Sequence, residues 1–149
     1  MTQQFSKNPP PVEIGSSQWT RPFWDAARQQ KLVAPRCVAC GTFRMPPTPF
    51  CPRCRSQEID WVTLSGRGLV YSYTVVVKAI LPGMEDCIPY MPAVIELPDA
   101  SGVRLISNIV DADPAHIRIG QTVQVVWHTL PDGEVVPRFK CCAAQEDMT

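Results

Sequence analysis

Apolar and polar residues alternate along the second half of the chain, from Asp60 to Phe139. The alternation is clearest over 69–78, where Leu69, Tyr71 and Tyr73 share one face and Val70 begins the other. A period of two is typical of a strand, whose successive side chains point to opposite sides of a sheet. Further segments with strand character are 61–65, 93–97, 103–110, 122–130 and 135–139.

Turn residues separate these segments. Asp99 to Gly102 predicts one hairpin, Asp132-Gly133 predicts another, and Gly66-Arg67-Gly68 indicates a turn or bulge. Five or six strands without an intervening helix, in about 80 residues, favour a small closed barrel that leaves no exposed edge. A five-stranded OB-type barrel fits best, and an SH3-like barrel or a small sandwich is the alternative.

The first third of the chain has a different pattern. Residues 1–16 contain a run of three prolines, which predicts an extended arm. Thr20 can cap a helix that runs toward Lys31 and places Phe23 and Ala27 on one face. One short helix cannot bury two large aromatic side chains by itself. We therefore expect it to pack on a neighbouring domain or another subunit, with docking residues Trp19, Phe23 and Trp24.

Between these parts lie two Cys-x-x-Cys pairs, Cys37/Cys40 and Cys51/Cys54, separated by ten residues. Four thiolates form a soft tetrahedral set that suits Zn²⁺ and leaves no open position for water or substrate. A disulfide pair or a metal-free remnant would be the alternative. The pattern of residues 42–47 predicts a short strand that ends at prolines. The ribbon as a whole is expected to span about residues 33–58. Because so small a ribbon has no core, the metal must hold it together.

These patterns divide the chain into an N-terminal arm and docking helix (1–32), a zinc ribbon (33–58), an OB-fold barrel (59–140) and a C-terminal tail (141–149). The fold class is mostly β, and the 16 prolines among 149 residues favour strands and turns over long helices. The odd count of seven cysteines argues against a disulfide framework and favours a reducing compartment. Without a secretion signal or an apolar run of about 18 residues, a cytoplasmic location is expected. The adjacent Cys141 and Cys142 are interpreted as ordinary thiols, with a redox pair or a partial metal site as the alternatives, and the sequence indicates no role for Cys87.

Charge differs between the two halves of the chain. Residues 1–56 carry eight basic and two acidic residues, a net charge of +6, and the remainder carries −6. A basic half around a zinc site suits a phosphate-bearing partner, either nucleic acid or a nucleotide-containing cofactor. A solvated basic face is the alternative.

Residues typical of an active site are missing from the sequence. It contains no nucleophile elbow, phosphate-cradling loop or dinucleotide fingerprint. His116 and His128 are isolated, and Asp111 and Asp113 precede a proline as turn formers. We do not expect this protein to be an enzyme on its own.

The order of these features resembles the DUF35 family, whose members combine a rubredoxin-like zinc ribbon with an OB fold and occur beside thiolase-like enzymes. The resemblance extends over about residues 19–139. Its motifs are Lys31-Leu32, Arg36-Cys37-Val38-Ala39-Cys40-Gly41, Met45-Pro46-Pro47, Cys51-Pro52-Arg53-Cys54, Ser65-Gly66-Arg67-Gly68, Val70-Tyr71-Ser72, Pro89-Tyr90 and Gly102-Val103-Arg104-Leu105.

This resemblance implies a non-catalytic accessory subunit of a thiolase-like or aldolase complex, with α2β2 stoichiometry, that helps to bind or position coenzyme A or an acyl-CoA. The zinc would be structural. The phosphates of coenzyme A would meet basic residues near the ribbon, with Arg36, Arg44, Arg53 and Arg55 as candidates. Two other functions stay open, a nucleic-acid-binding module and a scaffold that binds no small molecule. The acidic barrel half opposes the nucleic-acid module.

Overall fold

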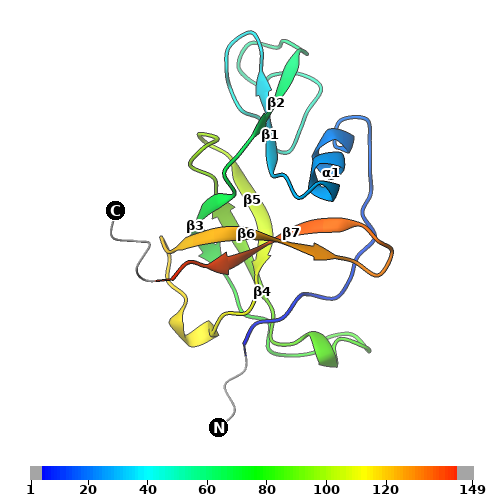
Figure 1. Ribbon diagram of the computed structural model, residues 1–149, viewed down its shortest axis with the longest axis vertical. Coiled ribbons are helices and arrows are strands. Elements are labelled where there is room, and N and C mark those ends of the chain that lie inside the picture. The colour runs from blue at the N-terminus through cyan, green and yellow to red at the C-terminus, as the bar shows by residue number, and fades with distance from the viewer. Residues whose placement is uncertain (1–4, 144–149) are drawn as a thin grey trace.

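Two groups of strands make up the fold, a ribbon at one end and a barrel at the other, with a helix beside the ribbon (Figure 1). The computed structural model describes residues 5–143. In chain order the elements are α1 (Arg21–Arg28), β1 (Val33–Cys37), β2 (Ile59–Thr63), β3 (Arg67–Tyr73), the 3-10 helix η1 (Glu85–Cys87), β4 (Met91–Glu96), β5 (Arg104–Ile109), the 3-10 helix η2 (Pro114–His116), β6 (Thr122–Thr129) and β7 (Val135–Cys141). None of the helices within residues 5–143 has the length and hydropathy that a membrane span requires.

The barrel is closed and has the strand order β3-β4-β5-β7-β6. Adjacent strands are antiparallel except β5 and β7, which run parallel and join at Ile109 and Phe139. Both predicted hairpins are present, β4–β5 and β6–β7, and their turns contain Gly102 and Gly133 at positive φ. A closed five-stranded barrel confirms the OB-type prediction over a sandwich.

Every second side chain of β4 points into the barrel and is buried there. On β4, Met91, Ala93 and Ile95 are buried while the residues between them are partly exposed. Gly68 on β3 lies so close to this layer that a Cβ there would clash with Ile95 Cγ2. The glycines predicted as a turn or bulge thus serve two purposes, since Gly66 adopts a φ of +87° and Gly68 makes room for Ile95.

The ribbon has a two-stranded sheet of its own. β1 pairs antiparallel with β2, from Val33 opposite Thr63 to Cys37 opposite Ile59. We expected the barrel to begin at residue 59, but β2 joins the ribbon and the first barrel strand begins at Arg67. The strand predicted over 42–47 is reduced to a single bridge between Arg36 and Phe43.

Helix α1 is shorter than predicted and ends at Arg28. Two residues later Gln30 adopts a φ of +57°, which turns the chain toward β1. Arg28 donates to Asp25 within the helix at 2.8 Å and to Glu134 of the β6–β7 hairpin at 2.9 Å. The helix therefore connects the ribbon to β7, rather than extending away from the molecule (Figure 1).

The extended arm is fixed to the barrel near its start. Ser6 is buried, and it exchanges backbone hydrogen bonds with Asp111 and Ala112. Lys7 forms a parallel bridge with Tyr90, and Asn8 accepts a hydrogen bond from Arg138. Residues 1–4 of the predicted arm and 144–149 of the predicted tail lie outside the described residues, and Cys141 belongs to β7.

Asp99 links the ribbon side of the barrel to the β4–β5 turn. Its Oδ2 accepts hydrogen bonds from Ser65 N at 2.9 Å and Ser65 Oγ at 2.5 Å. The two bonds from Ser65, and to a lesser extent the charge of Arg67, lower the pKa of the Asp99 carboxyl group. Because its pKa is lower folded than unfolded, Asp99 stabilises the fold above the unfolded-state pKa, about 3.9. This stabilisation is lost as the pH falls through the folded-state pKa.

Replacing Ser65 by alanine is expected to raise the pKa of Asp99 toward its usual value. The hydrogen bond from Ser65 Oγ to Asp99 is lost, and the order of the turn that holds Ser65 N against Asp99 is weakened. A carbon-13 NMR titration of the Asp99 carboxyl group measures this change. Ser101→Ala, in the same turn, is the control and should leave the pKa of Asp99 unaltered. An Asp99 pKa that is identical in wild type and Ser65→Ala would contradict the assignment.

Candidate functional site

The two cysteine pairs lie on tight turns of the same geometry. Gly41 N donates to Cys37 O at 2.9 Å, and Arg55 N donates to Cys51 O at 2.9 Å. The residue after each second cysteine has a positive φ, +78° at Gly41 and +66° at Arg55. Glycine adopts this conformation freely, whereas arginine pays about 1 kcal/mol or more. The turns direct both sulfurs of each pair toward one centre.

The four sulfur atoms of Cys37, Cys40, Cys51 and Cys54 lie within 4.8 Å of one another. The sulfurs of Cys37 and Cys54 are 3.5 Å apart, and those of Cys40 and Cys51 are 3.6 Å apart. A zinc ion with Zn–S bonds of ~2.3 Å holds its sulfurs about 3.8 Å apart, so this set fits tetrahedral Zn²⁺. A disulfide would need ~2.05 Å, and all four cysteines are free. The arrangement supports a structural zinc site.

Proton affinities in the cluster also favour a cation. Hydrogen bonds with the side chain and backbone of Thr42 lower the pKa of Cys40 to about 6. The backbone N–H of Ser56 favours the Cys54 thiolate, but hydrogen bonds with Cys37, burial and the other two thiols together raise the pKa of Cys54 to about 12. Four sulfurs this close cannot all ionise unless a positive ion neutralises them.

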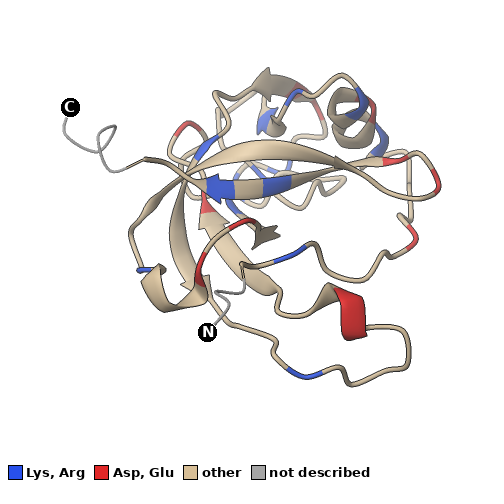
Figure 2. Cartoon of the chain, turned by 60° about the horizontal axis from the view of Figure 1, so that its bottom comes forward, with Lys and Arg blue, Asp and Glu red and all other residues tan. Residues whose placement is uncertain are grey.

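The four candidate arginines do not form one site. Arg44 is 4% exposed, and its guanidinium donates to the carbonyl oxygens of Ser56 and Gln57 within the ribbon. It braces the second knuckle and is not available to a phosphate. Arg36 pairs with Asp60 at 3.2 Å, whereas Arg53 and Arg55 are exposed. Figure 2 shows basic residues spread over several elements and not gathered in a single patch.

The three aromatic residues predicted to dock a partner differ in burial, since Phe23 is buried and Trp19 and Trp24 are partly exposed. Phe23 is 7% exposed and belongs to the main core, because α1 packs on β1 and β7 of its own chain. We expect the helix to pack on a neighbouring domain or another subunit, and for Phe23 the cover comes from the ribbon and the barrel of the same chain. Trp24 lies edge-on to Phe23, with ring centroids 4.9 Å apart, and it is half-buried, as is Trp19.

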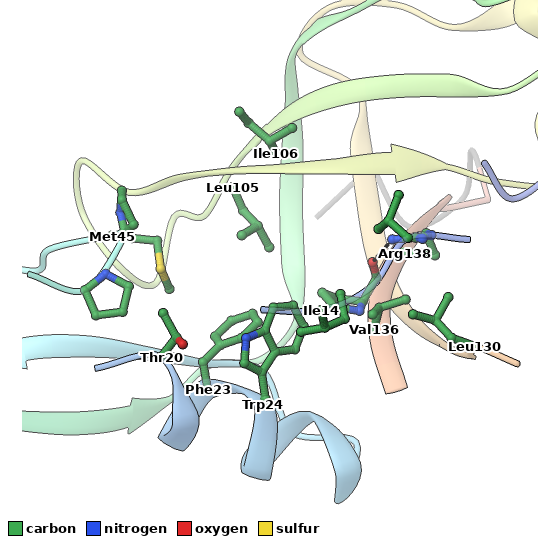
Figure 3. Close-up of a pocket in the computed structure, with 14 residues that line it drawn as sticks. Ile14, Thr20, Phe23, Trp24, Met45, Leu105, Ile106, Leu130, Val136 and Arg138 are labelled. Carbon is green, nitrogen blue, oxygen red and sulfur yellow. Dashed lines mark hydrogen bonds between the residues drawn. The ribbon is translucent and has the colours of Figure 1, made fainter. Parts of the chain in front are cut away.

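Beside α1 the structure contains a cavity of about 280 Å³ that the sequence did not reveal. It lies between the arm, α1, a ribbon loop, β5 and β7 (Figure 3). Almost all of its lining is apolar. The lining residues are Val12, Ile14, Thr20, Phe23, Trp24, Met45, Pro46, Pro47, Leu105, Ile106, Leu130, Val136, Pro137 and Arg138. Only the periodicity of α1 hinted at this surface, since the other residues come from segments far apart in sequence.

Two ion pairs of the barrel join residues that lie outside the ribbon and α1. His116 Nδ1 lies 2.7 Å from Asp113 Oδ2 in η2, and Lys140 pairs with Asp111 at 3.1 Å. Burial, followed by the charge of Arg138, lowers the pKa of His128 on β6. Within residues 5–143, the four ribbon cysteines are the only cluster of three or more potential metal ligands.

Two family models match adjacent parts of the chain. The rubredoxin-like zinc ribbon domain of ChsH2 matches residues 24–60, and the C-terminal OB-fold domain of ChsH2 matches residues 61–128. Together they include all four cysteines and most of the barrel.

Several known proteins are similar in sequence. A probable enoyl-CoA hydratase alpha subunit of Thermomonospora curvata is 40% identical over 84% of this chain. The match spans only 38% of that subunit's length, so the chain is much shorter than this relative. A DUF35 domain-containing scaffold protein of Methanocaldococcus jannaschii is 38% identical, over 68% of this chain and 70% of its own. The benzoylsuccinyl-CoA thiolase subunit BbsA of Thauera aromatica is 31% identical, and the match covers 70% of this chain and 69% of that subunit.

A solved structure agrees with the fold along nearly the whole chain. A chain of the Ltp2-ChsH2(DUF35) aldolase superposes with a TM-score of 0.79 and 35% identity, which covers 88% of this chain and 100% of that one. A DUF35 protein of unknown function from Sulfolobus solfataricus, at 20% identity and a TM-score of 0.62, shares the fold. The matched domains and the relatives of similar length show that this chain belongs to the DUF35 family, with a zinc ribbon and an OB fold of the ChsH2 type.

Proposed function

We propose that this protein is a zinc-containing, non-catalytic accessory subunit of a thiolase-like or aldolase complex that makes or cleaves a carbon–carbon bond in acyl-CoA substrates. The observation that carries this proposal is the 35% identity and 0.79 TM-score to a chain of the Ltp2-ChsH2(DUF35) aldolase, which this chain matches over that chain's full length. A relative named as a thiolase subunit supports the same class of complex, and relatives named as hydratase alpha subunits support an association with enzymes that act on acyl-CoA.

The zinc in this proposal holds the ribbon in shape and takes no part in the reaction. Four cysteine ligands fill its coordination sphere, so no position remains for water or a thioester. The nucleophile and the general base would come from the partner. This division of roles agrees with the name scaffold protein given to the archaeal relatives.

We place the partner against Trp19 and the outer side of Trp24, next to the ribbon. Both indoles stay half-exposed although α1 packs on the barrel of the same chain, whereas Phe23 is buried in the core. Val38 and Phe50 on the ribbon are 59% and 57% exposed and extend the same kind of apolar contact. Tryptophan is enriched among the residues that dominate interface energies. Two copies of each subunit, α2β2, is the assembly we propose.

We also propose that this chain contacts coenzyme A through arginines of the ribbon. Arg53 and Arg55 on the second knuckle are exposed and lack a carboxylate partner within residues 5–143. They can therefore approach the phosphates of an acyl-CoA held by the partner. Arg36 is less available because Asp60 already pairs with it, and Arg44 is excluded by its burial.

The test is co-expression of this chain with a thiolase-like or aldolase protein encoded beside its gene. We expect an equimolar complex whose thiolysis or retro-aldol activity requires both chains. Trp19→Glu should weaken the complex by about 30-fold or more, because an interface tryptophan contributes about 2 kcal/mol or more. Light scattering and calorimetry measure the assembly and its Kd.

Tyr71→Glu is the control, since Tyr71 is a 46% exposed aromatic on β3, outside α1 and the ribbon. It should leave the Kd unaltered. Full activity of the partner alone would sink the proposal, and so would steeply salt-dependent binding of this chain to an oligonucleotide.

A further inference from the structure

The cavity beside α1 has the lining of a small-molecule site. Apart from Thr20 and Arg138, all of its side chains are apolar, and Leu130, Val136 and Pro137 close it on the barrel side. In Figure 3 the rings of Phe23 and Trp24 and the side chains of Met45 and Leu105 surround one hollow. Pockets for small ligands combine such an apolar lining with a few polar groups that set orientation.

Arg138 is the charged group at this cavity, and its charge is not neutralised. Its Nε donates to Asn8 Oδ1 and its NH1 to Pro137 O, both at 3.1 Å. No carboxylate within residues 5–143 forms an ion pair with it. Arg138 is half-buried, and this burial lowers the pKa of its guanidinium. A half-buried cation bonded only to neutral oxygens would gain from an anion.

The size of the cavity limits what can enter. A cavity of ~150 Å³ lined by aliphatic and aromatic side chains holds a benzene molecule. At about 280 Å³ this cavity has nearly twice that room, enough for a chain of roughly eight carbons or two fused rings. Coenzyme A as a whole is far too large to enter, and neither Arg53 nor Arg55 lines the cavity.

We propose that this cavity binds a small amphiphilic carboxylate, with its apolar body against Phe23, Trp24 and Leu105 and its carboxylate on Arg138. The site lies within this chain and needs no residue of the partner enzyme, and the zinc bears on it only through the ribbon loop at 45–47 that lines the cavity. The carboxylate would complete the ion pair that Arg138 lacks, while the body would fill apolar space that water occupies poorly.

The experiment uses the zinc-loaded full chain with octanoate, and with octanol as a neutral probe of the same length, in titration calorimetry. We expect one saturable octanoate site per chain and weaker binding of octanol. Arg138→Met should weaken octanoate at least tenfold and change octanol little, because it removes the charge that the carboxylate contacts, and the Asn8→Ala variant accounts for the bond to Asn8 that is lost with it. Lys140→Met, two residues along β7 and paired with Asp111, should leave both affinities unaltered.

Two more variants separate binding from folding. Asn8→Ala removes the anchor of the arm on Arg138 but keeps the charge, and should still bind octanoate. Leu105→Trp fills the hollow and should prevent binding of both probes. The proposal is overturned if octanoate fails to saturate the wild-type chain, as it would if a partner's peptide segment were the true occupant. It is equally overturned if octanol binds as tightly as octanoate, or if Leu105→Trp binds both like wild type.

Discussion

Replacing Cys37 by serine is expected to abolish stoichiometric zinc binding and unfold the ribbon. Cys37 is 1% exposed, and its sulfur lies 3.5 Å from that of Cys54 across the centre of the four-cysteine set. Structural zinc contributes about 10 kcal/mol or more of coupled folding energy in small domains. A lone pair of strands is marginal in water, and apart from the metal the ribbon's sheet is supported by the packing of β1 on α1.

Metal analysis of the purified protein and amide NMR signals of residues 33–63 measure this loss. The barrel signals should persist, since β1 and β2 share no strand pairing with β3 to β7. Cys87→Ser is the matched control, because Cys87 lies in η1 outside the cluster, and it should retain one zinc per chain. A Cys37→Ser protein with full metal content would show that three cysteines suffice to hold the metal, and a ribbon that stays folded without metal would show that it is not metal-dependent.

Replacing Phe139 by alanine is expected to cost about 3–5 kcal/mol of unfolding free energy. Phe139 is fully buried, pairs with Val125 on β6, and meets Ile109 at the parallel contact that closes the barrel. Its carbonyl oxygen also accepts from Val110 N at 2.9 Å. Truncation would leave a void where three strands converge, in a domain whose total stability is about 5–15 kcal/mol.

Urea unfolding in the presence of zinc measures this loss. Ile119→Ala provides the comparison, because Ile119 is 63% exposed and its truncation should change stability by less than about 0.5 kcal/mol. If Phe139→Ala lost no more than Ile119→Ala, the barrel interior would not be the main source of stability.

The barrel was predictable because its signals are local. Alternation and the turns at 99–102 and 132–133 fix the strands and two of the hairpins without any knowledge of the tertiary structure. The same alternation misplaced β2, since a strand pattern does not say which strand is its partner. The strand from Leu69 also ends at Tyr73, after a bulge between Val70 and Ser72, and the next residues pair only through single contacts.

The metal ligands were equally predictable, because Cys-x-x-Cys spacing alone places two sulfurs on one turn. The burial of Arg44 was not predictable, since an arginine in a basic segment is usually exposed. Its burial depends on the carbonyl oxygens of Ser56 and Gln57, which only the folded ribbon turns toward it. The cavity beside α1 required the tertiary structure for the same reason, because five separate segments meet there.

The ribbon leaves the rest of the molecule through one narrow connection. Val33 pairs with Thr63, and just outside them Leu64 N donates to Leu32 O at 2.8 Å. The chain therefore departs for the ribbon and returns from it at adjacent points. A two-residue turn could join Leu32 to Leu64, but it would remove the cover that β1 and the loop at 45–47 give to α1, so the metal-binding lobe is joined to the barrel at one place and packed against the helix at another.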